Sequence, residues 1–115
     1  MEKEYLYQTS DPLRIEEAQK KMPDTSSIEQ LADFYKVMGD TTRLKLLMAL
    51  ETGEFCASDL ANVSQMTRSA VSHQLKTLKS NKLVKSRKKG KTVYYSLDDE
   101  HIHSVLKVAL EHILE

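Results

Sequence analysis

The chain has 115 residues, of which 40 % are hydrophobic and 30 % are charged, and its formal net charge is zero. This length fits one small domain, and no apolar run approaches the 18 residues of a transmembrane helix, so we expect no membrane partner. The single cysteine excludes an intramolecular disulfide within one chain. Since the N-terminus also lacks a secretion-type apolar stretch, the sequence predicts a cytoplasmic protein.

The N-terminal part of the chain predicts two helices. The first spans Leu13–Met22 between two prolines, with Asp11 as its N-cap. Because this helix is polar nearly all round, we expect residues 1–27 to form an arm that adds to a dimer surface. Ser27 is expected to cap the second helix, which ends at Gly39.

The middle of the chain predicts a helix-turn-helix. The three helices expected here are 41–50 capped by Asp40, 54–64 with Leu60 and Val63 facing inward, and 68–80 capped by Thr67 with Val71, Leu75 and Leu78 on one face. The second and third are short and are joined by a tight break at Gln65–Met66, which is the spacing of a helix-turn-helix motif.

The hydrophobic period then changes from helical to alternating. Residues 83–87 and 92–97 are predicted strands, and Gly90 supplies the positive φ of the turn at 88–91. A helix-turn-helix followed by such a hairpin predicts a winged helix-turn-helix fold, mainly α with a small β-hairpin wing. The last helix, 98–115, has an apolar band too wide for a helix lying on a small domain, which predicts a homodimer through the terminal helices.

The zero net charge hides a basic centre. Residues 41–97 hold eleven Lys/Arg and three Asp/Glu, a charge of +8, while each flanking segment carries −4. Such a centre suits binding to a polyanion. Two alternatives need no partner: a solvated surface of mixed charge, and lysines that protect the edge of a strand from pairing. The expected partner is double-stranded DNA, because hydroxyls, amides and cations contact base edges and phosphates. The predicted DNA-contacting residues are Thr67, Arg68, Ser69, Ser72, His73, Gln74, Lys76, Arg87, Lys88, Lys89 and Lys91.

Four segments resemble the ArsR/SmtB family of metal-responsive winged-helix repressors. They are VMGDTTRLKLLMAL at 37–50, EFCASDLA at 54–61, SAVSHQLKTLK at 69–79 and VYYSLDD at 93–99. The resemblance implies that residues 28–115 form a winged helix-turn-helix with a C-terminal helix for dimerisation and metal sensing. One departure is the turn NVSQMT, which lacks the family's frequent glycine. Gln65 is therefore expected to take a positive φ there, at about 1 kcal/mol.

The C-terminal helix carries a candidate metal site. His101, His112 and Glu115 share one helical stripe, but the two histidines lie about 16 Å apart along the axis. Two antiparallel copies would bring Asp99 and His101 of one helix to His112 and Glu115 of the other, giving two identical sites per dimer. Two imidazoles and two carboxylates favour Zn(II), with Co(II) or Ni(II) as possible substitutes. The D-x-H…H-x-x-E spacing is also similar to the zinc site of the family's zinc sensors, whereas a His-rich surface helix is the alternative. His103 is off the stripe and is expected to be a plain surface residue.

Cys56 and Asp59 match a second metal site of the family, but residues 1–27 hold neither Cys nor His to complete it. We therefore expect Cys56 to be a small, buried apolar residue.

The resemblance further implies that the metal-free dimer binds a pseudo-palindromic operator, that Zn(II) releases it, and that the controlled gene serves metal efflux or sequestration. The alternatives are a thiol- or other-effector-responsive repressor that uses Cys56, and a dimeric zinc-buffering protein. A zinc hydrolase is disfavoured because four ligands would close the site and no catalytic set is evident, so neither enzymatic activity nor a small-molecule substrate is expected.

Overall fold

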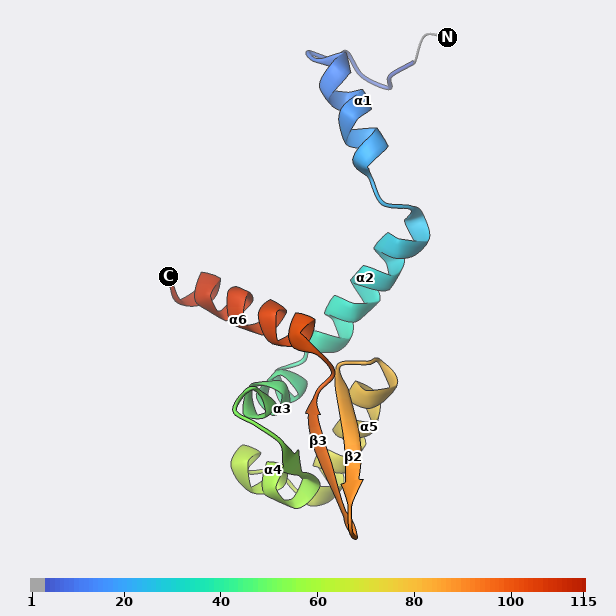
Figure 1. The fold of residues 1–115 in the computed structure, drawn as a ribbon. Coiled ribbons are helices and arrows are strands. Elements are labelled where there is room, and N and C mark those ends of the chain that lie inside the picture. Colours follow the sequence, from blue (N-terminus) through green and yellow to red (C-terminus); the bar gives the residue numbers. More distant parts are fainter. Residues whose placement is uncertain (1–3) are drawn as a thin grey trace. The chain divides into compact units, whose positions relative to one another are not determined.

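The computed structural model describes residues 4–115, and the chain divides into two compact units, residues 1–32 and 33–115 (Figure 1). The described elements are, in chain order, α1 (Pro12–Lys21), α2 (Thr25–Met38), α3 (Thr41–Glu51), β1 (Phe55–Cys56), α4 (Ala57–Ser64), α5 (Arg68–Ser80), β2 (Val84–Lys89), β3 (Thr92–Leu97) and α6 (Glu100–Leu114). The predicted winged helix-turn-helix is confirmed by this order and by the hairpin that follows α5. No helix in the described part of the chain is both long and apolar enough to cross a membrane.

In the first unit, α1 begins with its predicted cap. Asp11 Oδ1 accepts the backbone N–H of Arg14 at 3.2 Å, and no residue of α1 is buried. The predicted start of α2 is wrong, because the helix already begins at Thr25. Ser27 is therefore inside the helix, where its hydroxyl donates to the carboxylate of Asp24, and this bond holds the pKa of Asp24 below its ordinary value.

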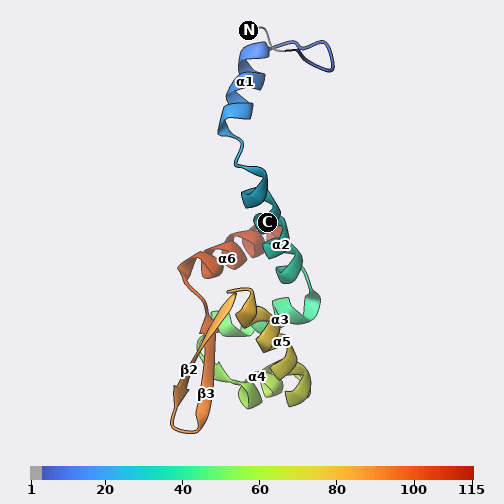
Figure 2. The ribbon, with the colours of Figure 1, turned by 90° about the vertical axis from the view of Figure 1, so that its right-hand side faces the viewer.

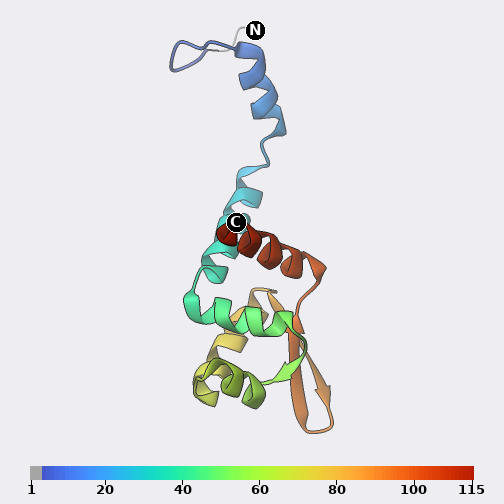
Figure 3. The same ribbon diagram turned by 90° about the vertical axis from the view of Figure 1, so that its left-hand side faces the viewer.

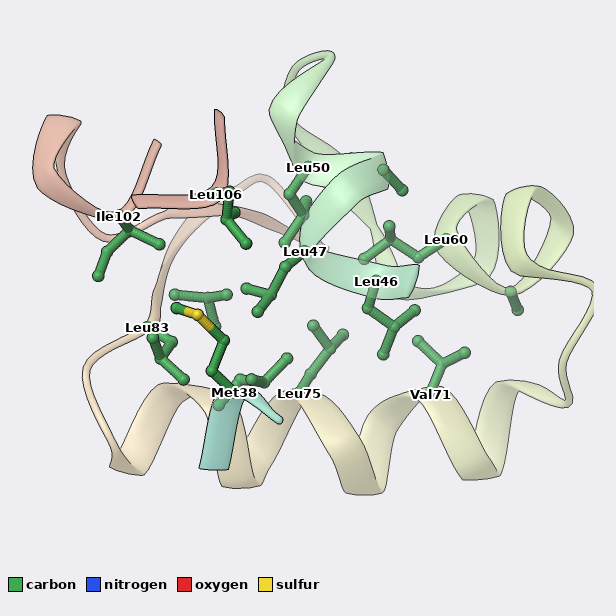
Figure 4. Packing of buried hydrophobic residues seen from close by; sticks show 14 residues of the cluster. Met38, Leu46, Leu47, Leu50, Leu60, Val71, Leu75, Leu83, Ile102 and Leu106 are labelled. Carbon is green, nitrogen blue, oxygen red and sulfur yellow. The ribbon is translucent and has the colours of Figure 1, made fainter. Parts of the chain in front are cut away.

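The core of the second unit lies where α3, α5 and α6 meet (Figure 4). Val71, Leu75 and Leu78 of α5 are fully buried, as their helical spacing predicts, and they pack with Leu46 and Leu47 of α3. Burying each such side chain contributes about 1.5–3 kcal/mol. This cluster fixes which face of α5 turns toward solvent.

Helices α3 and α5 keep their predicted caps. Asp40 accepts a backbone N–H at the start of α3 and Thr67 does so for α5, and Asp99 caps α6 in the same way. Each side-chain oxygen satisfies a donor that has no partner within the helix, which typically contributes about 1 kcal/mol.

For the buried face of α4 and the turn that follows it, one prediction is wrong and the others are confirmed. Leu60 is buried as predicted, but the inward position of Val63 is wrong, because its side chain is 55 % exposed. The buried residues of α4 are Leu60, Ala61 and Ser64, and Val63 lies about 100° from their centre at 100° per residue. Gln65 takes the left-handed conformation expected of a turn without glycine, with φ 56° and ψ 44°.

The sheet has three antiparallel strands in the order β1-β3-β2. The prediction of one helix over 54–64 is wrong at its start, because Phe55 pairs with Tyr95 and so makes β1 a third strand. Local periodicity does not reveal such a short strand, since its partner lies about forty residues away. The hairpin turn is shorter than predicted, because Lys88 and Lys89 belong to β2, and Gly90 takes the expected positive φ of 63°. The hairpin extends away from the helices with its turn as the free end (Figure 2).

The last helix, α6, runs beside α3 (Figure 3). Ile102 and Leu106 are buried in the core, whereas the apolar residues of the last two turns are not. Ile113 and Leu114 are each 75 % exposed. α6 therefore has a core-packed first half and an uncovered apolar second half.

Candidate nucleic-acid interface and metal site

The face of α5 opposite its buried residues is polar and open. Ser69 and His73 lie about 150° or more from the centre of the buried face at 100° per residue. The predicted DNA-contacting residues that are exposed on or beside α5 are Thr67, Arg68, Ser69, Ser72, His73 and Lys76. Hydroxyl, imidazole and cationic groups of this kind contact base edges and phosphates.

Gln74 differs from the other predicted contacts in burial, because it alone among them is half-buried. Its Oε1 accepts from Arg43 Nε at 3.0 Å, across the junction of α5 with α3. Arg43 was not predicted as a site residue. It is one of two charged residues in the stretch 43–50, with Lys45, and nothing in the sequence separates the two.

A polar hollow of about 370 Å³ joins α5 to the hairpin. Its lining includes Arg68 and Ser72 from α5, Lys91 from the turn, and the start of α4. The lysines at the tip, Lys88, Lys89 and Lys91, are all exposed. Cations from the helix and from the hairpin therefore meet at one surface.

Arg87, a predicted DNA contact of the hairpin, is bound to another side chain of the same chain. Its Nε and Nη2 each lie 2.7 Å from a carboxylate oxygen of Glu54, and its guanidinium lies 5.4 Å from the ring centre of Tyr94. The Arg87 bond, more than any other contact, holds the pKa of the Glu54 carboxyl below its ordinary value, and Glu54 in turn raises the pKa of Arg87. Glu54 therefore neutralises one of the predicted cations of the wing.

The predicted metal ligands form two pairs, one at each end of α6. Asp99 Oδ2 lies 3.4 Å from His101 Nδ1, and His112 Nδ1 lies 3.9 Å from Glu115 Oε1. The side chains are open to solvent, with exposed fractions from 50 % for Asp99 to 93 % for His101. The bond to His101 and the backbone N–H groups at the helix start hold the pKa of Asp99 below its ordinary value, so this carboxylate is ionised and able to ligate.

Each pair supplies one imidazole and one carboxylate, which is half of a four-ligand set of the kind that zinc takes. The pairs are eleven residues apart, about 16 Å along the helix. Within residues 4–115, no three His, Cys, Asp or Glu side chains of one chain come together at a metal-binding distance. The donor chemistry thus fits a metal. One protomer carries two separate pairs of ligands, but neither pair alone completes a four-ligand site.

His103 is not the plain surface residue that we expected. Its Nδ1 lies 2.8 Å from Glu51 Oε2, at the end of α3, and the Glu51 side chain is only 19 % exposed. Helical spacing correctly placed His103 away from His101, but it could not show that α3 runs beside this side of α6.

Cys56 is a free thiol at the start of α4 that is half-buried, not fully buried as predicted, and its side chain does not cap that helix. Asp59 follows in the first turn and is exposed. In the described chain, neither belongs to a group of three potential ligands.

Comparison with known proteins places these features in context. The family model described as bacterial regulatory protein, arsR family, matches residues 40–86. The chain is 38 % identical over 106 residues to a transcriptional repressor SmtB homolog of Synechocystis, covering 90 % of this chain and 80 % of the relative. It is 36 % identical over 100 residues to a CadC homolog of Staphylococcus aureus, described as a cadmium resistance regulatory protein, covering 86 % and 82 %. A homodimeric winged helix-turn-helix DNA-binding domain of Mycobacterium bovis matches the fold with a TM-score of 0.70 and 28 % identity, over 81 % of this chain and 92 % of that one.

Proposed function

Since this chain belongs to the ArsR/SmtB family of metal-responsive transcriptional repressors, we propose that it is released from its operator by Zn(II). In this proposal a metal-free homodimer binds a pseudo-palindromic operator, and Zn(II) binds at the dimer interface. The observation that carries the proposal is α6 itself, which has an uncovered apolar second half and one imidazole–carboxylate pair at each end.

The DNA-binding part rests on the polar face of α5 and the lysines of the hairpin. The N-terminal half of α5 would enter the major groove, with Ser69, Ser72 and His73 at base edges. Lys88, Lys89 and Lys91 would contact phosphates, which gives affinity and salt dependence without sequence information.

The dimer is supported by the uncovered half of α6. Val108, Leu110, Ile113 and Leu114 are all exposed, and contiguous apolar surface of this kind marks an interaction site. A related fold is described as homodimeric. A two-fold axis between antiparallel α6 helices would cover this surface with its own copy.

The same symmetry supports the metal site. It would place Asp99 and His101 of one protomer beside His112 and Glu115 of its partner, so that each dimer holds two sites. The four side chains would supply two nitrogen and two oxygen ligands, a donor set that Zn(II) takes, and would thereby link the two helices when the metal is bound. Asp59 and Cys56 stay weak candidates for a second site.

The chain's own residues would pass the effect of metal to DNA. A ligating imidazole normally donates its other N–H to a nearby oxygen, so His112 is the proposed link to the DNA-binding elements. Metal would favour a dimer whose two α5 helices no longer match the operator half-sites, and DNA must weaken metal binding by the same factor. By the family resemblance, the controlled gene would encode a metal efflux or sequestration protein.

Mixed dimers test the shared site directly. His101→Asn and His112→Asn each destroy both sites of a homodimer. A heterodimer of the two variants keeps one intact site, because the undamaged histidines face each other at one end. Mixing equal amounts should restore about one quarter of the wild-type zinc capacity, since half of the dimers are mixed and each has one of two sites.

Zinc capacity is measured by equilibrium dialysis, with His103→Asn as a matched control that should keep full capacity. Zero capacity in the mixture, after exchange of protomers is confirmed by mass spectrometry, would refute the shared site. In a parallel DNA assay, His112→Asn should no longer release operator DNA on addition of Zn(II). Release by that variant would refute the proposed link.

A further inference from the structure

Arg43 of α3 connects three helices, α2, α3 and α5. Its Nε donates to Gln74 Oε1 at 3.0 Å, and its Nη1 donates to the Val37 carbonyl at 3.3 Å. Its backbone N–H is bound by the Asp40 cap at 3.0 Å. Val37 lies in the last turn of α2, where carbonyls lack partners within the helix. One part-buried side chain thus ties the end of α2, the start of α3 and the middle of α5 together.

The orientation of the Gln74 amide follows from chemistry. A guanidinium group has only donors, so the amide atom that faces Arg43 must be the carbonyl oxygen. The amide NH₂ group of Gln74 then points elsewhere. Glutamine recognises adenine through both its oxygen and its nitrogen, and the oxygen of Gln74 is already engaged by Arg43.

The position of Gln74 on α5 also separates it from the outward face. At 100° per residue, Gln74 lies about 70° from the centre of the buried face, whereas Ser69 and His73 lie about 150° or more from it. Gln74 is half-buried, whereas both of the other residues are exposed. It stands where α5 meets α3, at the flank of the helix.

We propose that Gln74 is a positioning residue rather than a base reader. Held by Arg43, it fixes the rotation of α5 about its axis, and thereby aims Ser69 and His73 at the base edges. This inference rests on the DNA-binding role of α5 in the proposed function, and it is independent of metal.

The test compares substitutions that keep or remove the bond to Arg43. Gln74→Glu keeps an acceptor for Arg43 and removes the NH₂ donors, whereas Gln74→Met has a similar length and removes both. The probes are a duplex selected by the wild-type protein from a random pool and a scrambled duplex of equal length. Gln74→Glu should stay within about threefold of the wild-type Kd and keep every base preference, whereas Gln74→Met and Arg43→Met should lose about tenfold or more on the selected duplex only.

A double-mutant cycle isolates the Arg43–Gln74 contact from other effects. In an Arg43→Met background, Gln74→Glu leaves a part-buried carboxylate without its partner, so it should weaken binding about tenfold more than in the wild type. Thermal melting confirms that each variant is folded. If Arg43→Met does not fold, Arg43→Lys replaces it. This variant keeps the positive charge but cannot donate to Gln74 and to the Val37 carbonyl with the geometry of a guanidinium group. His73→Asn serves as the reader control, and should change a base preference.

Two results would overturn the proposal. One is that Gln74→Glu changes the preference at a single base pair or weakens binding as much as Gln74→Met, which would make Gln74 a base reader. The other is that Gln74→Met binds the selected duplex as tightly as the wild type. A wild-type protein that selects no duplex over the scrambled one would refute the DNA-binding role itself, which is a different failure.

Discussion

The Arg87–Glu54 pair predicts that only part of the basic wing contributes to salt-dependent DNA binding. Arg87 is neutralised by two 2.7 Å contacts with Glu54, whereas Lys91 is exposed at the tip beside Arg68. Each neutralised phosphate adds about 0.9 to the slope of log K against log salt. For two protomers, Lys91→Gln should reduce this slope by about 1.8, which is a change of about 12-fold in relative affinity between 50 and 200 mM salt.

The matched variant is the double substitution Glu54→Gln with Arg87→Gln, which removes one charge of each sign and so keeps the net charge of the chain. Its slope should equal that of the wild type, because the pair contributes no net charge to the DNA surface. The assay is fluorescence anisotropy of a labelled duplex titrated with protein at four or more salt concentrations. If the double variant loses as much slope as Lys91→Gln, Arg87 exchanges Glu54 for a phosphate and the reasoning is refuted.

Three further predictions concern stability. Gln65→Gly should stabilise the chain by about 1 kcal/mol, because Gln65 has a φ of 56° that glycine adopts without steric cost; a lower midpoint in urea unfolding would contradict this. Leu106→Ala should destabilise by about 2–5 kcal/mol, because Leu106 is only 2 % exposed and anchors α6 in the core; an unchanged melting temperature would show that α6 is not fixed by this contact. Because Arg87 lowers the pKa of Glu54 in the folded state, the stabilisation by Glu54 is present above its ordinary pKa and is lost as the pH falls through the folded value. Glu54→Gln should therefore be less stable than the wild type at pH 7, and this difference should shrink as the pH falls below the ordinary pKa of a glutamate. A difference that does not shrink in acid would disprove the ion pair as the cause.

Local sequence patterns predicted the helices and the hairpin because these elements depend on nearby residues. Asp40 and Thr67 mark helix starts through short-range bonds to the backbone. Val71 and Leu75 mark the buried face of α5 through spacing alone. The family resemblance added one further feature. Because the family often has glycine in this turn, the resemblance indicated that Gln65 takes a left-handed conformation there.

The features that were missed depend on contacts between residues far apart in the chain. Arg43 and Gln74 are 31 residues apart, Glu54 and Arg87 are 33 apart, and Glu51 meets His103 across two helices. Periodicity gives the face on which a side chain lies, but not which element covers that face. A complete metal site cannot be seen in one chain either, because the predicted ligands at each end of α6 would be joined by ligands from a second copy of the chain.

The measurement that tests the central claim most directly is the binding of a fluorescent operator duplex, taken from upstream of the gene, at fixed salt. Protein is titrated first with a chelator present and then with excess Zn(II). A zinc-released repressor should bind tightly under chelator and lose most of this affinity with Zn(II), and His101→Asn should bind equally well in both conditions. Tight binding that Zn(II) leaves unchanged would contradict zinc as the effector, and it would direct attention to Cys56 as the alternative sensor.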